Sequence, residues 1–330
     1  MTPLSPWPRR GLIAALAVLT LLLVVISLMT GRVATPWSAW LDTSDPRWTI
    51  IFELRLPRTL LAAAVGAALG MSGAALQGYT RNPLADPGIL GVSAMAALGA
   101  VMTLYLGKGA AETWVMASAA MAGALAGVLL LMVISGQAST TVTFILAGVI
   151  LNTVASAGVS LALNLAPNPW AVSEIVNWLM GSLTDRSMNE VQFALPLIAA
   201  GLVLLLSTAR ALDALTLGET GARSLGIPMG LTRWTLALGV ALSCGASVAA
   251  TGVIGFVGLV VPHLLRPFLG SRPGALLAAS AVGGAVLVLA ADILVRLLPT
   301  AVELKLGVAM AALGGPFFFG LLMTLRRRMA

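Results

Sequence analysis

Residues 55–91, RLPRTLLAAAVGAALGMSGAALQGYTRNPLADPGILG, indicate the architecture expected for the whole chain. Their first part, about 59–77, is apolar and long enough to form a helix inside a membrane. The small side chains of this helix share one face: Gly66, Gly70, Gly73 and Ala74. Small residues let two helices approach closely in lipid, where dispersion contacts take over the role that the hydrophobic effect has in water. We therefore expect a membrane helix that packs tightly through this glycine face.

A turn rich in helix-capping residues follows this helix. Asn82 and Asp86 each stand directly before a proline, Pro83 and Pro87 respectively. Asn and Asp side chains accept hydrogen bonds from the first N–H groups of a helix, and a proline at the first helical position has no N–H to leave unsatisfied. The pattern predicts that each pair caps a helix start. Two membrane helices, packed on each other, would then be joined by a stiff turn.

The composition of the 330-residue chain excludes an ordinary soluble domain. Hydrophobic residues make up 59% of the chain and charged residues 9%, whereas soluble domains carry about 25% charged residues. This composition predicts an all-α, polytopic membrane helix bundle that forms a single transmembrane domain over residues 1–330. The formal net charge of +7 indicates topology rather than nucleic acid binding, because basic residues in membrane proteins gather in cytoplasmic loops.

Few residues in the sequence are suited to catalysis or metal binding. One cysteine, Cys244, and one histidine, His263, leave neither a disulfide within the chain nor a cysteine or histidine metal site. The nucleotide-binding pattern GxxxxGK[ST] does not occur. We therefore expect no bound metal, no cofactor and no enzymatic activity in this chain. Any ATP, with its Mg²⁺, would be used by another subunit.

Windows of about 20 mostly apolar residues predict ten membrane spans. They lie near residues 11–30, 59–78, 89–106, 114–134, 142–163, 191–209, 233–252, 255–269, 275–297 and 305–325. The first is expected to stay as a span, because its apolar run of about 19 residues exceeds a typical signal-peptide core. With both termini in the cytoplasm, basic residues predominate on the cytoplasmic side and the charges outside nearly cancel, in line with the positive-inside rule.

Two longer loops are expected to carry short helices. On the outer side, residues 164–190 contain an apolar stretch that is too short to cross a membrane, and we interpret it as a re-entrant or surface helix. On the cytoplasmic side, residues 210–232 place Glu219 and Arg223 four residues apart, a spacing that suits an exposed helix face. Periodicity leaves two interpretations of this inner segment open: a connector on the membrane surface, or a helix that inserts into a groove of a partner protein.

Arginines mark the outer ends of two predicted spans. Arg55 and Arg58 lie three residues apart at the start of the second span, and Arg296 closes the ninth span one turn after Asp292. One interpretation is that the arginine side chains reach the membrane interface, and that Asp292 and Arg296 form a pair that neutralises both groups at the membrane edge. The other is a basic patch that receives carboxylates of a soluble partner and steers its docking. Residue spacing does not separate the two.

Several of these segments resemble the signature of the FecCD-type permeases, the iron-chelate and cobalamin branch of ABC importers. The resemblance rests on residues 55–93, GFVGLVVPHLLRPFLG (255–270), ADILVR (291–296) and LGGPFFFGLL (313–322). In addition, LGETGARSLGI (217–227) is similar to the family's coupling segment, and NWLMGSL (177–183) to its outer stretch before the sixth span. The likeness extends from about residue 55 to 325 in the family's order and spacing. Lys305 stands where the family usually has proline.

The resemblance implies a type II ABC importer permease in the inner membrane, which pairs with a second permease subunit as a homodimer or heterodimer. Two cytoplasmic ABC ATPase subunits would drive it, and a periplasmic or lipid-anchored substrate-binding protein would deliver an iron–siderophore complex. It also implies that Arg55, Arg58 and Arg296 are docking arginines for carboxylates of the binding protein. The coupling segment that meets the ATPase would include Gly218, Glu219, Ala222, Arg223, Leu225 and Gly226.

Two alternatives remain open. Within the family, cobalamin or haem would replace the iron–siderophore complex as the cargo. From a different class, an ion-coupled secondary transporter would need acidic residues and broken helices at mid-membrane depth. In this sequence only Asp292 approaches such a position, near the end of a span.

Overall fold

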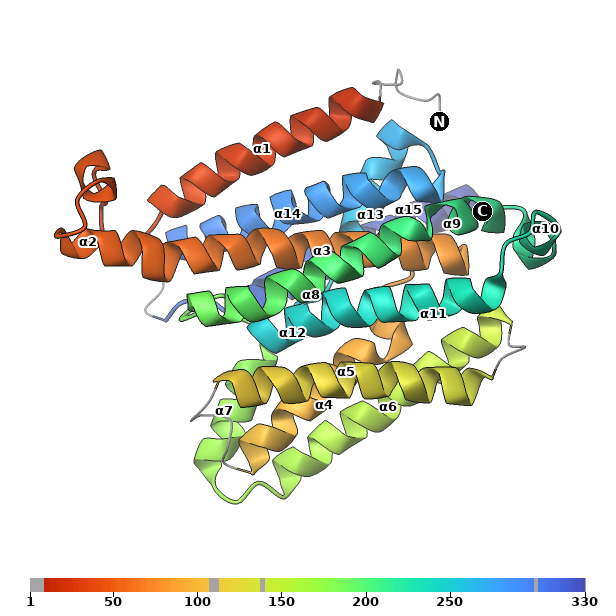
Figure 1. Ribbon diagram of the computed structural model, residues 1–330, viewed down its shortest axis with the longest axis horizontal. Helices are drawn as coiled ribbons and strands as arrows, with labels where there is room; N and C mark the ends of the chain where they lie inside the picture. The colour runs from red at the N-terminus through yellow and green to blue at the C-terminus, as the bar shows by residue number, and fades with distance from the viewer. Residues whose placement is uncertain (1–8, 107–112, 137–139, 300–301, 330) are drawn as a thin grey trace.

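The computed structural model describes residues 9–106, 113–136, 140–299 and 302–329, and within these ranges the chain is helical throughout, without strands. The long helices lie side by side in one bundle (Figure 1). Among these described residues, seven helical segments are long and apolar enough to cross a membrane. Three shorter apolar helices occupy the remaining expected spans, over Val92–Tyr105, Val257–Leu269 and Leu306–Leu321. The all-α bundle of about ten membrane helices is therefore confirmed for the described part of the chain.

The helices are, in chain order, α1 (Arg9–Met29), the 3-10 turn η1 (Trp37–Trp40), α2 (Pro46–Thr49), the π-helical segment η2 (Ile50–Arg55), α3 (Leu56–Thr80), the 3-10 turn η3 (Pro87–Leu90), α4 (Val92–Tyr105), α5 (Thr113–Ser135), α6 (Thr141–Asn164), α7 (Pro169–Leu179), α8 (Met188–Ser207), α9 (Ala209–Leu215), α10 (Gly218–Ser224), α11 (Met229–Val240), the π-helical segment η4 (Ala241–Gly245), α12 (Ala246–Thr251), α13 (Val257–Leu269), α14 (Pro273–Leu297) and α15 (Leu306–Met329). The last helix begins directly after Lys305.

The glycine face of α3 makes the close contacts that the sequence predicts. A Cβ atom added at Gly66 would lie 2.3 Å from the carbonyl oxygen of Gly284 in α14, and one at Gly70 would lie 2.0 Å from that of Ser280. At Gly73 the nearest atom would be the carbonyl oxygen of Gly258 in α13, at 1.9 Å. Any side chain larger than hydrogen would therefore separate α3 from the two helices that pack on it.

The expectation that α3 packs on the helix that follows it is wrong. α3 packs chiefly on α14, whereas α4 packs chiefly on α5 and α6. Left-handed backbone at Arg81 (φ 50°) and Gly91 (φ 72°) redirects the chain between the two helices. Asp86 caps the turn η3 by accepting the N–H of Gly88 at 2.9 Å. Asn82 accepts the N–H of Leu84 at 3.0 Å, but this bond closes a turn and no helix begins there.

The chain is interrupted between α12 and α13, where Gly252 (φ 73°) and Phe256 (φ 67°) take left-handed backbone. Pro262 lies inside α13 and does not end it. The N–H of Ser182 donates to the carbonyl of Thr251 at 2.7 Å, and the N–H of Gly307 donates to that of Gly181 at 3.1 Å. The end of α12 and the start of α15 are thus fastened to the loop after α7.

The two ends of the bundle differ in what they carry. The short helices α9 and α10 lie at one end, together with the start of α1 and the end of α15 (Figure 1). α2 and α7 lie at the opposite end, which we call the outer end. The expected short helices of both long loops are therefore present, α7 in the outer loop and α9 with α10 in the inner one.

Candidate functional sites at the two ends of the bundle

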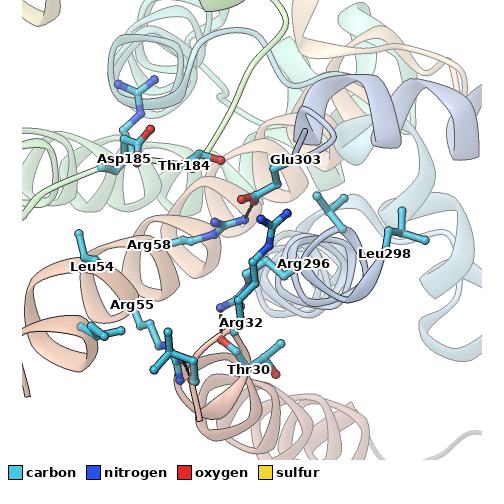
Figure 2. A pocket seen from close by; sticks show the side chains of 15 residues that line it. Thr30, Arg32, Leu54, Arg55, Arg58, Thr184, Asp185, Arg296, Leu298 and Glu303 are labelled. Atoms are coloured by element: carbon cyan, nitrogen blue, oxygen red, sulfur yellow. Dashed lines mark hydrogen bonds and ion pairs between the residues drawn. The ribbon is translucent and has the colours of Figure 1, made fainter. Parts of the chain in front are cut away.

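The outer end holds a pocket of about 260 Å³ between α1, α3, α14 and the loops beside them (Figure 2). Its charged lining combines basic and acidic side chains: Arg32, Arg55, Arg58, Arg186, Arg296, Asp185 and Glu303. The structure therefore brings together all three arginines that the sequence singles out.

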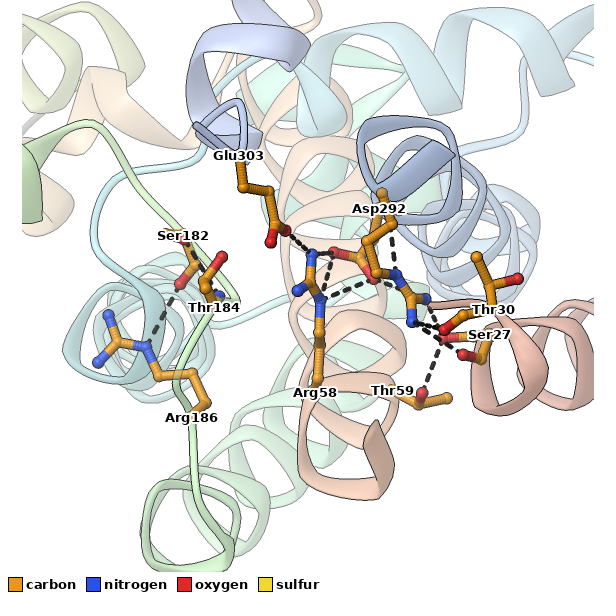
Figure 3. Close-up of polar contacts among 10 residues, drawn as sticks. Ser27, Thr30, Arg58, Thr59, Ser182, Thr184, Arg186, Asp292 and Glu303 are labelled. Carbon is orange, nitrogen blue, oxygen red and sulfur yellow. Dashed lines mark hydrogen bonds and ion pairs between the residues drawn. The ribbon is translucent and has the colours of Figure 1, made fainter. Parts of the chain in front are cut away.

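Two of these arginines share one buried carboxylate (Figure 3). Arg58 donates to Asp292 at 2.7 Å, and Arg296 pairs with the other oxygen of Asp292 at 2.9 Å. Arg58 also forms an ion pair with Glu303. The Asp292 side chain is 1% exposed, compared with 12% for Arg58 and 7% for Arg296. The i,i+4 pair of Asp292 and Arg296, one of the two interpretations left open by the sequence, is present, and Arg58 joins it to Glu303.

Arg296 also fixes the end of α1. Its guanidinium donates to the carbonyl oxygens of Ser27 at 2.8 Å and Thr30 at 3.0 Å, and to the Ser27 hydroxyl at 2.6 Å. Ser27 in turn shares a hydrogen bond of 2.7 Å with the Thr59 hydroxyl of α3. The cluster therefore joins α1, α3 and α14 at the outer end.

Arg55 differs from the other two arginines because it binds its own chain. It is 5% exposed, and it donates to the carbonyls of Leu28 and Met29 and to the Thr35 hydroxyl, each at 3.0 Å. A further bond reaches the carbonyl of Val33. Arg55 is the last residue of the π-helical segment η2. Arg55 thus closes the loop after α1.

The inner end presents the predicted coupling segment. Gly218 (φ 86°) and Gly226 (φ 78°) bracket α10 with left-handed backbone. Ala222 is buried, whereas Arg223 and Leu225 are exposed. The segment is therefore a short helix with one free face.

Glu219 does not share that free face, and no ion pair with Arg223 forms between these two described side chains. Its carboxylate turns inward and accepts the backbone N–H of Thr141 at 2.7 Å and the Thr141 hydroxyl. Burial raises the pKa of Glu219, but the hydrogen bonds from Thr141 and the charges of Arg233 and Arg223 outweigh burial and leave the pKa below its usual value. Glu219 is therefore ionised at neutral pH.

α6 carries a feature for which the sequence made no prediction. This helix lies at the edge of the bundle (Figure 1), and its middle and outer parts expose a polar stripe: Asn152, Thr153, Ser156, Ser160 and Asn164. The Asn152 amide makes no side-chain hydrogen bond within the described part of the chain. The steps of three and four residues place these side chains on one face of a helix. Polar residues at this helical spacing within the span predicted over 142–163 were the signal in the sequence that could have indicated the stripe.

Comparison with known proteins identifies the family. The model of the FecCD transport family matches residues 19–324. The chain is 41% identical over 319 residues to the vitamin B12 import system permease protein BtuC of Vibrio cholerae. This alignment covers 96% of this chain and 94% of the relative. It is 40% identical over 306 residues to the Fe(3+) dicitrate transport system permease protein FecD of Escherichia coli, with 92% and 95% covered.

Solved structures agree with this assignment. An inward-facing ABC transporter, assigned to the metal-chelate type, superimposes with a TM-score of 0.87 at 31% identity, over 96% of this chain and 99% of that chain. PsaBC from Streptococcus pneumoniae, at a TM-score of 0.57 and 16% identity, shares the fold alone. The chain belongs to the FecCD transport family and is a multi-pass membrane permease of the ABC-importer class.

Proposed function

We propose that this chain is the permease subunit of an inner-membrane ABC importer that moves an iron–siderophore complex from a binding protein to the cytoplasm. Family membership implies an ATPase and a second permease subunit. In the proposed assembly two ATPase subunits bind the inner end, where both termini lie in the cytoplasm. A periplasmic or lipid-anchored binding protein docks on the outer end. The chain itself performs no chemistry, and ATP and Mg²⁺ are used by the ATPase subunits.

The polar stripe of α6 is the observation that carries this proposal. An amide or hydroxyl moved from water into a medium without hydrogen-bond partners costs roughly 4–8 kcal/mol. Thr153 and Ser160 offset part of this cost by donating to helix carbonyls, but Asn152 does not. A helix of 24 residues with an exposed amide at its centre is therefore poorly suited to lipid on that face. The stripe suits a water-filled path shared with the second permease subunit.

The polar stripe suits an ATP-driven transporter that works by alternating access and must release its cargo. The stripe offers neutral hydroxyl and amide groups, so a bulky chelate would meet many weak contacts and no tight site, which favours release. No carboxylate of the described residues lies at the middle of a span, and Asp292, near the end of α14, is paired with Arg58 and Arg296. An ion-coupled mechanism, which needs such groups, is therefore less well supported than an ATP-driven one.

Reconstitution tests the function directly. In proteoliposomes that contain the permease, its ATPase and its binding protein, chelate uptake is expected only when ATP is present on the side of the membrane that holds the ATPase subunits. Ser156→Leu, which narrows the stripe, should lower uptake several-fold while ATP hydrolysis continues. Ser118→Leu, at an exposed serine of α5 outside the stripe, is the matched control. Uptake driven by an ion gradient alone would reject the proposal.

Cobalamin is the second candidate cargo, favoured by the relatives that are named vitamin B12 permeases. Both cargoes are large metal chelates, and haem belongs to the same chemical class. Uptake of iron–siderophore, cobalamin and haem should be compared in the same proteoliposomes, each with the purified binding protein. Faster uptake of cobalamin or haem would replace the iron–siderophore assignment without affecting the permease assignment.

The outer arginines are proposed to receive carboxylates of the binding protein. Carboxylates of this chain that already pair with these arginines would then compete with the binding protein. Burial raises the pKa of Glu303, but the hydrogen bond and charge of Arg58 outweigh burial and lower the pKa. Glu303 is thus ionised at neutral pH and occupies Arg58. We expect Glu303→Gln to strengthen binding-protein affinity by about two- to fivefold, the range of a partly exposed ion pair.

Glu174→Gln provides the matched control for this prediction. Glu174 is an exposed carboxylate of α7 at the same end, so the substitution changes the net charge equally without releasing Arg58. The Kd of the complex should be measured at low and high salt for both variants and for Arg58→Gln, which should weaken binding in a salt-dependent way. Equal affinities for the two glutamate variants would contradict docking at Arg58.

A further inference from the structure

The hydrogen bonds of Glu219 connect two helices that the proposed function treats separately. Glu219 belongs to α10, the short helix at the inner end, and Thr141 is the first residue of α6, the helix that carries the polar stripe. The first N–H groups of a helix have no partner within the helix. The Glu219 carboxylate accepts one of them, at 2.7 Å, together with the hydroxyl of the same residue.

The charge of Glu219 strengthens this contact. The N-terminus of an α-helix carries a partial positive charge, and a carboxylate placed there is stabilised. Hydrogen bonds with one ionised partner are also about twice as strong as those between neutral groups. The carboxylate is therefore well suited to hold the start of α6 when α10 is displaced.

Neighbouring contacts place the same junction against α3 and α11. Arg233 of α11 donates to the Tyr79 hydroxyl of α3 at 3.0 Å. The Tyr79 ring meets the edge of the Phe144 ring, one turn into α6, with 5.5 Å between centroids. Phe144 and Tyr79 are both fully buried. The start of α6 therefore packs on α3 through buried aromatic rings and is hydrogen-bonded to α10 through Glu219.

The free face of α10 points away from this junction. Leu217 and Leu225 are 68% and 62% exposed, and Arg223 is exposed beside them. In the proposed assembly these residues face the ATPase, whereas Glu219 faces α6. We propose that Glu219 is a positioning residue that transmits displacement of α10 to α6, so that movement of the ATPase shifts the wall of the substrate path. This inference rests on the proposed function.

The geometry gives such a displacement a long reach. A helix of 24 residues spans roughly 36 Å at 1.5 Å per residue. α6 lies at the edge of the bundle (Figure 1), and its stripe residues are exposed, so no helix in the described part of the chain covers that face. A shift at Thr141 would therefore tilt the whole stripe.

The test is the ratio of ATP hydrolysed to chelate imported, measured for the complete transporter in proteoliposomes. Glu219→Ala is expected to raise this ratio about tenfold, within the usual range of coupling between sites, because hydrolysis continues while import falls. Thr141→Val removes the hydroxyl from the other side of the contact and should raise the ratio in the same direction. Ser207→Ala, which removes an exposed hydroxyl of α8 outside the coupling segment, is the control and should leave the ratio unchanged.

A double-mutant cycle separates transmission from a general structural effect. If Glu219 acts through Thr141, the double variant should be no worse than Glu219→Ala alone, since contacting residues are not additive. Additive effects, or equal losses of hydrolysis and import that leave the ratio unchanged, would overturn the inference. If Glu219→Ala does not fold, Thr141→Val and Glu219→Gln supply the same comparison. Absence of ATP-driven import by the unmodified transporter would instead reject the proposed function.

Discussion

Replacing Asp292 with alanine is expected to lower the free energy of unfolding by about 3–5 kcal/mol, the usual cost of breaking a buried ion pair from one side. Asp292 is the shared partner of Arg58 and Arg296, and its side chain is 1% exposed. Its removal leaves two buried guanidinium groups with one carboxylate, Glu303, that reaches only Arg58. Unfolding of the purified permease in detergent, followed by heat or denaturant, measures the effect.

The control for Asp292 is an ion pair of similar geometry on the surface. Arg272 pairs with Asp213 at 2.6 Å, but its side chain is 62% exposed, so Arg272→Gln should cost no more than about 1 kcal/mol. Combining Asp292→Leu with Arg58→Met and Arg296→Met should recover much of the loss, because an apolar replacement of a whole buried cluster is often neutral. A smaller effect for Asp292→Ala than for Arg272→Gln would show that the cluster does not hold the outer end together.

The helices could be predicted from the sequence because the membrane requires long apolar runs. Where the sequence predicts a span over 142–163, the structure has Thr141–Asn164, and where it predicts 275–297 the helix is Pro273–Leu297. The partner of each helix could not be predicted in this way. The glycines of α3 indicate a close contact, but small residues suit any neighbour, and the structure places α14 and α13 opposite them while α4 packs on α5 and α6.

In the candidate sites, too, contacts between residues close in the sequence could be predicted, whereas contacts between distant residues could not. The spacing of Asp292 and Arg296 made their pair one of two interpretations, because residues four apart meet on a helix. Arg58 lies 234 positions away from Asp292 in the sequence, so their contact could be seen only in the folded structure. The same holds for Glu219, whose spacing to Arg223 suggests a local pair. The N–H at the start of α6 offers a better partner than an exposed arginine does, since exposed pairs are worth little.

The glycine contacts of α3 lead to the second large effect, expected for Gly73→Ala. Alanine normally favours a helix over glycine by about 1 kcal/mol. Here the added Cβ would lie 1.9 Å from the Gly258 carbonyl oxygen and 2.4 Å from its carbonyl carbon. Both obstacles are backbone atoms, so no flexible side chain can move aside and α13 itself must shift. Overpacking of this kind typically costs about 1–3 kcal/mol and occasionally more.

Gly230→Ala is the matched control, because Gly230 lies in the helix α11 with no atom within 4 Å of an added Cβ. We expect it to leave the unfolding midpoint unchanged or to raise it slightly, while Gly73→Ala lowers it. Gly73→Ala should also reduce the yield of folded permease in the membrane, since α13 can be displaced only by moving the helices packed on it. If the two substitutions shift the midpoint equally, α3 and α13 do not touch at Gly73, and close packing through the glycine face would have to be limited to α14.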